Sequence, residues 1–166
     1  MPHAAVVLVL AALVATCAEA KEESAPRPKT TQSATRTLTA TQRTLMLQLL
    51  RAAPKRGKVW FAVPSGDANA ASVQQMLQSV FEEAGWTSRT RTVEKKVLNP
   101  GVTILVADVW NPPYVDAAVG AIAASGLPVK AAKGYREYVE KQKGENPTWQ
   151  GVTLEKDQDY VVVIGP

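Results

Sequence analysis

The sequence predicts an α/β domain in which a mainly parallel, three-layer sheet of about five strands packs between helices. Two observations predict this class. From residue 58 onward, short apolar runs alternate with longer amphipathic segments, which is the pattern of strands connected by helices. Several apolar runs are continuous, as expected for strands that are buried on both faces. Residues 58–166 suffice for one hydrophobic core.

The first elements of this domain follow from their periodicity. Residues 59–63 (VWFAV) are a continuous apolar strand, and residues 69–85 carry one apolar stripe at helical spacing that ends at a glycine. Residues 86–93 alternate and are rich in Thr, which is typical of a more exposed strand. Residues 102–107 (VTILVA) have the composition of a second central strand.

The second half of the domain continues the alternation of strands and helices, and the sequence contains no internal repeat. Residues 113–125 begin with a proline and are followed by a glycine, which predicts a helix. A short strand over 127–131, a helix over 133–143 and a buried strand over 160–164 complete the pattern. In the loop before the last strand, Trp149 is expected to pin an ordered turn. We expect a Rossmann-like domain with core order 2-1-3-4 and the last strand at an edge or near the fourth strand.

Ahead of the domain, residues 40–52 predict a short amphipathic helix. Thr39 and Gln42 have the spacing of a capping box, and Pro54 ends the apolar periodicity. With its connector, this helix occupies residues 39–57. Its apolar face has two interpretations, packing against the domain or contact with a partner or a membrane surface.

Residues 1–20 have the character of a targeting segment or short anchor. Residues 4–15 are an unbroken apolar run, which is short for a spanning helix and of the right length for a signal peptide. An A-x-A pattern predicts cleavage after residue 20, whereas a lipobox-like sequence predicts lipidation of Cys17. An uncleaved membrane anchor is a third interpretation. All three place the domain outside the cytoplasm, in the periplasm or on a membrane, behind a flexible polar linker over residues 21–38.

The composition excludes several kinds of site. The single histidine, His3, and the single cysteine, Cys17, both lie in the targeting segment. A domain without these residue types has no Ser-His-Asp triad, Cys nucleophile, Cys/His zinc site or disulfide. The net charge of +4 is spread along the chain without a dense basic stripe, so no nucleic-acid binding is indicated. We therefore expect a non-enzymatic domain that needs no metal and no cofactor.

The expected ligand site is a cleft at the carboxyl ends of the first and third strands, where the strand order reverses. The loops there offer a helix N-terminus, hydroxyl, carboxylate and amide groups, and one aromatic ring. Neither loop has the spacing of a dinucleotide-binding or P-loop motif. The residues expected to bind a ligand are Ser65, Gly66, Asp67, Asn69, Asp108, Trp110 and Asn111.

Other interpretations of these residues stay open. Ser65 or Asp67 also suits a helix cap, with Gly66 making the turn. Asp67 and Asp108 together suggest a hydrolase or phosphate-ester enzyme that uses two carboxylates. Asp108 has the place of the phosphoacceptor in response-regulator receivers, but the acidic pair and the lysine of that family are missing. The cations Lys130, Lys133 and Arg136 indicate either attraction of an anion or acidic partner, or solvated surface charge.

Six segments carry a resemblance: residues 38–42, 53–55, 59–66, 81–86, 124–129 and 161–165. Through them, the stretch from Leu38 to Pro166 resembles a group of uncharacterised bacterial envelope proteins. These proteins have one or more N-terminal membrane segments followed by a small Rossmann-like domain. The resemblance implies a fold and a tethered location, but no activity. We therefore expect an envelope-tethered domain that binds a small ligand or a protein partner.

Overall fold

The computed structural model describes residues 37–55, 57–94 and 97–166. The predictions for the targeting segment, for lipidation of Cys17 and for the linker before residue 37 lie outside the described residues. The described elements are α1 (Ala40–Arg51), β1 (Lys58–Pro64), α2 (Ala68–Glu83), β2 (Thr87–Val93), β3 (Val102–Val106), α3 (Pro113–Ala124), β4 (Val129–Ala132), α4 (Tyr135–Glu145) and β5 (Tyr160–Ile164). No helix within these ranges is both long and apolar enough to cross a membrane.

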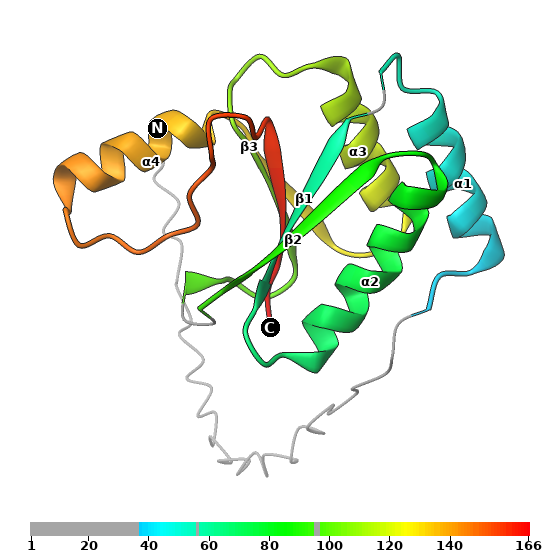
Figure 1. Ribbon diagram of the computed structural model, residues 1–166, viewed down its shortest axis with the longest axis horizontal. Coiled ribbons are helices and arrows are strands. Elements are labelled where there is room, and N and C mark those ends of the chain that lie inside the picture. Colours follow the sequence, from blue (N-terminus) through cyan, green and yellow to red (C-terminus); the bar gives the residue numbers. More distant parts are fainter. Residues whose placement is uncertain (1–36, 56, 95–96) are drawn as a thin grey trace, which may run out of the picture. The chain divides into compact units, whose positions relative to one another are not determined.

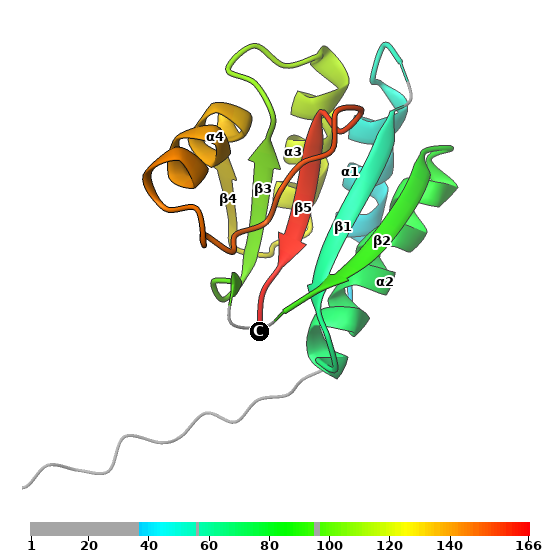
Figure 2. The same cartoon turned by 60° about the vertical axis from the view of Figure 1, so that its left-hand side comes forward.

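The five strands form one mixed sheet in the order β2-β1-β5-β3-β4. This confirms the α/β class and corrects the predicted core order, because β5 lies between β1 and β3. Strand β5 runs parallel to β1 and antiparallel to β3. The pairs β1–β2 and β3–β4 are each parallel. The sheet therefore contains two parallel halves that run in opposite directions, and β5 joins them (Figure 2).

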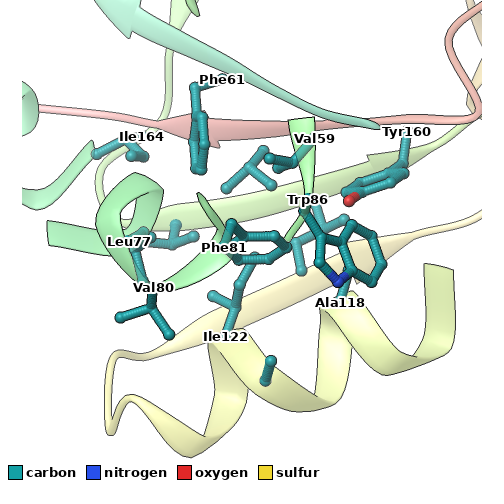
Figure 3. Close-up of a cluster of buried hydrophobic side chains, with 14 of the residues drawn as sticks. Val59, Phe61, Leu77, Val80, Phe81, Trp86, Ala118, Ile122, Tyr160 and Ile164 are labelled. Atoms are coloured by element: carbon teal, nitrogen blue, oxygen red, sulfur yellow. The ribbon is translucent and has the colours of Figure 1, made fainter. Parts of the chain in front are cut away.

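Three helices cover one face of the sheet. Figure 1 shows α1, α2 and α3 on this side and α4 on the other. Alternate residues of the central strands, such as Phe61, Ile104 and Val162, point into the helical side and are fully buried. In Figure 3, Phe61 and Phe81 meet edge to face, with ring centroids 6.1 Å apart. This arrangement extends the apolar core with a favourable aromatic geometry.

Helix α1 belongs to this core. Its capping box is formed as predicted, because Thr39 and Gln42 exchange hydrogen bonds through both side chains and backbone amides. Met46 and Leu50 are fully buried. The indole Nε1 of Trp86 donates to the Leu50 carbonyl at 3.2 Å, which fixes the end of α1 against the domain. The apolar face of α1 therefore packs on the domain.

The opposite face of the sheet has a thinner cover. Ala62, Leu105 and Val163 point to this side and are packed by Leu98 and by the segment that connects α4 to β5. That segment, residues 146–159, has no helix or strand of its own. In the described part of the chain, the cover on this side consists of one helix and irregular segments, which leaves room for a groove.

Candidate functional site

The two loops of the predicted cleft lie at opposite ends of the sheet. Strand β1 is parallel to β5, and β3 is antiparallel to β5, so β1 and β3 run in opposite directions. Their carboxyl ends are separated by about the length of a strand, ~17 Å for five residues. Figure 2 shows the loop after β1 at one end of the sheet and the loop after β3 at the other. The prediction that both loops form one cleft was wrong.

The first loop follows the helix-cap interpretation. Asp67 is the N-cap of α2, and its Oδ1 accepts from the Ala70 amide at 2.9 Å. Gly66 has a φ of +74°, which suits a glycine in a tight turn. Ser65 and Asn69 are exposed. Capping accounts for Asp67 without a ligand.

The second loop is held by its polar residues and exposes its apolar ones. Asp108 lies 3.8 Å from the Arg136 guanidinium. The Asn111 amide donates to the Asp116 carboxylate at 3.0 Å. Between them, Trp110 is 92% exposed and Val109 is 60% exposed. Trp110 is therefore neither buried in the domain nor part of a cleft with Ser65.

The positions of the two loops also determine whether the charged residues predicted for the site can act together. Asp67 and Asp108 cannot act on one substrate, because they lie at opposite ends of the sheet. Arg136 donates to the carbonyls of Glu155 and Gln158, so it holds the α4–β5 connection in place. Lys133 lies 3.9 Å from Asp116.

The thinly covered face of the sheet contains a groove that the sequence did not predict. Its volume is about 620 Å³. Strands β3, β4 and β5 form its floor, α4 forms one wall, and residues 97–99 and 149–152 form the other. We call it the α4 groove. Its apolar lining includes Leu98, Leu105, Tyr135, Tyr138, Trp149 and Val152.

Three aromatic rings line the α4 groove, and the Tyr138 ring contacts the other two. Tyr135 and Tyr138 lie one helical turn apart on α4, with ring centroids 5.5 Å apart. The Trp149 ring meets Tyr138 edge to face at 6.3 Å. Trp149 also packs directly on Gly151, where any added Cβ would overlap the indole. The Trp149 amide donates to the Asn146 carbonyl at 2.9 Å, which confirms the ordered turn predicted there.

Polar groups line the rest of the α4 groove. Asn99, Thr103 and Gln150 contribute neutral side chains, and no hydrogen bond to any of these side chains occurs among the described residues. Burial, with a smaller contribution from Tyr138, raises the pKa of Tyr135 to about 12, while Arg91 acts in the opposite sense. The Tyr135 hydroxyl therefore stays protonated at neutral pH and can both donate and accept.

A second hollow of about 340 Å³ continues the α4 groove toward the end of β2. The two hollows share Val97 and residues 150–152. Arg91 of β2 donates to the Thr153 carbonyl and so ties β2 to the segment that connects α4 to β5. Burial lowers the pKa of the Arg91 guanidinium, and the charge of Glu155 partly offsets this.

The described residues offer no group of three or more His, Cys, Asp or Glu side chains that could hold a metal ion. The residues that line the α4 groove come from five separate parts of the chain, and they form no local sequence motif. The one available signal was the pair Tyr135 and Tyr138 on a polar helix, followed by Trp149 in a Gly/Pro-containing loop.

Comparisons with known proteins add no functional information. The chain matches no model of a protein family and no curated protein sequence. Among solved structures, it aligns with "Solution Structure of the C-terminal domain of RV0431". The two are 12% identical, and the alignment covers 100% of this chain and 98% of the other with a TM-score of 0.36. Similarity at this level carries no argument about fold or function.

Proposed function

We propose that this chain is a non-enzymatic binding domain that takes its ligand into the α4 groove. The observation that carries the proposal is the contact cluster of Tyr135, Tyr138 and Trp149 beside polar side chains that have no hydrogen-bond partner among the described residues. Ligand sites are typically concave, mostly apolar and aromatic, with a few polar groups, and measure ~300–1,000 Å³. The α4 groove has each of these properties.

The side-chain chemistry of the groove favours binding over catalysis. Among the described residues that line the 620 Å³ hollow, the ionisable side chains are Lys133 and two tyrosines. The pKa of Tyr135 is raised, which opposes its use as a base at neutral pH. No carboxylate lines this hollow in the described residues, so a pair of acid and base is lacking there.

We also propose that the domain acts outside the cytoplasm, behind its N-terminal segment. The support is the apolar run over residues 4–15 and the cleavage and lipidation patterns that follow it. The ligand would then come from the cell envelope or its surroundings.

The binding proposal can be tested by amide chemical shifts of the full chain. We expect that a panel of sugars, nucleotides, short peptides and aromatic acids contains a compound that shifts Tyr135, Tyr138 and Gly151. Trp149→Ala should abolish these shifts. Trp110→Ala is the matched control, because it removes an exposed indole outside the groove. Binding at residues 65–69 instead, or no shift in the groove by any compound, would refute the proposal.

A further inference from the structure

Resting on the proposed function, we propose that the ligand of the α4 groove is an uncharged oligosaccharide built from pyranose rings. The inference stands on four properties of the groove: its aromatic walls, its neutral hydrogen-bonding groups, its low charge and its length. Each restricts the chemical class of the ligand in a different way.

The aromatic walls suit a saturated ring. One face of a pyranose ring presents several C–H groups, which pack on the electron-rich face of an indole or phenol. Tyr138 and Trp149 are nearly perpendicular, with 81° between their planes. Two walls at this angle contact both the face and the edge of one ring.

The neutral polar groups suit hydroxyls. Sugar hydroxyls donate and accept at once, so they need partners that can do the same. The amides of Asn99 and Gln150 offer both functions, and so do the hydroxyls of Thr103 and Tyr135. None of these four side chains has a hydrogen-bond partner among the described residues, so their capacity is available to a ligand.

The charge of the groove disfavours anionic ligands. Lys133 is the one cation among the described residues of the 620 Å³ hollow, and Asp116 lies 3.9 Å from its Nζ. A nucleotide or a phospholipid headgroup carries one or more phosphate charges, which proteins usually meet with several cations or a glycine-rich loop. The 620 Å³ hollow offers neither, and in the second hollow the cation Arg91 is accompanied by the anion Glu94, so an uncharged ligand is favoured.

The shape of the groove separates a sugar from a proline-rich peptide. Aromatic surfaces that bind polyproline II helices hold the prolines in grooves between their rings. Here Tyr138 and Trp149 touch each other, with centroids 6.3 Å apart, and leave no slot between them. The hollow extends past residues 150–152 into the second hollow, which provides length for more than one sugar ring.

The test titrates the full chain with four probes: maltotriose, tri-N-acetylchitotriose, hexaproline and GMP. Binding is followed by amide shifts and isothermal calorimetry. We expect one of the trisaccharides to shift the amides of Tyr135, Tyr138 and Gly151. Two variants of nearly unchanged shape each lose one hydroxyl: Thr103→Val replaces it by a methyl group, and Tyr135→Phe deletes it. Each should weaken trisaccharide binding about fivefold, the value of one hydrogen bond.

Controls separate binding from folding. Trp149→Ala should weaken binding tenfold or more, and Trp149→Phe should recover part of it because a ring is restored. Trp110→Ala should leave the affinity within twofold. If Trp149→Ala unfolds, which circular dichroism detects, the variants Thr103→Val and Tyr135→Phe decide the question alone.

The outcomes distinguish the two proposals. If hexaproline or GMP shifts the groove and neither trisaccharide does, the sugar inference is overturned while the binding function stands. If no probe shifts the groove and the panel of compounds also fails, both proposals are overturned. If a trisaccharide binds but Thr103→Val and Tyr135→Phe both bind it unchanged, the proposed recognition is wrong.

Discussion

Tyr135 lines the α4 groove and also contributes to the stability of the domain. Burial and the neighbouring Tyr138 raise its pKa from 10.0 to about 12 in the folded chain. An unfolded chain ionises this phenol near pH 10, whereas the folded chain keeps the proton until about pH 12. Folding is therefore favoured by this residue below pH 10, and that contribution is lost as the pH rises from 10 to 12.

Urea unfolding at several alkaline pH values measures this contribution. The free energy of unfolding of the wild type should fall more steeply between pH 10 and 12 than that of Tyr135→Phe, which has no phenol to ionise. Other groups that titrate at alkaline pH are present in both proteins, so their contributions to the free energy of unfolding cancel in the comparison. Parallel curves for the two proteins would contradict the raised pKa.

Two glycines should respond in opposite ways to the same substitution. Gly151→Ala forces the Trp149 indole away, because the added Cβ overlaps it. We expect a loss of about 1–3 kcal/mol in the free energy of unfolding. Gly144→Ala, in α4, meets nothing within 4 Å and should gain about 0.5–1 kcal/mol from helix propensity. Thermal and denaturant unfolding of both variants checks the pair, and equal effects would argue against the packing described at Trp149.

At the scale of elements, the loop before α2 has a structural role that a mutation can isolate. Asp67→Ala should lower the free energy of unfolding by about 1 kcal/mol, because the Ala70 amide loses its acceptor. Asp67→Asn keeps a capping oxygen and should lose less. Ser65→Ala, in the same exposed turn, should change stability by less than about 0.5 kcal/mol. Denaturant unfolding measures all three, and an unaffected Asp67→Ala would refute the cap.

Helices and strands were predictable because their signals are local. The capping box at Thr39 and the apolar stripe of α2 each fix an element within a few residues. The direction of a strand has no such signal. Tyr160–Ile164 is buried along its whole length, and that pattern is the same for a parallel or an antiparallel neighbour. A connection of 14 residues, 146–159, lets β5 reach the centre of the sheet.

At the scale of the whole molecule, the position of β5 determines that the predicted cleft does not form. With β5 at an edge or near β4, the loops after β1 and β3 were expected to converge. With β5 between them, Ser65 and Trp110 belong to opposite ends. The α4 groove could not be predicted, because residues 97–99, 103–105, 135–138 and 149–152 become neighbours only in the folded sheet.

The processing of the whole chain is testable by mass. We expect the mature protein to begin at Lys21, as the A-x-A pattern indicates. Intact-mass measurement of the protein from membrane and soluble fractions would identify this form. A lipid-modified Cys17 at the N-terminus would show that the chain is processed as a lipoprotein, and the proposed location outside the cytoplasm would stand. An intact, unmodified Met1 chain in the cytosol would refute it.

The central place of β5 also has a consequence for the order of events in synthesis. Strands β1 and β3 each pair with β5, which follows both of them in the sequence, so β5 joins the two halves of the sheet. The sheet cannot close until β5 has left the ribosomal exit tunnel. The core of the domain is therefore completed late in its synthesis, and the segment before β5 has no complete sheet of its own.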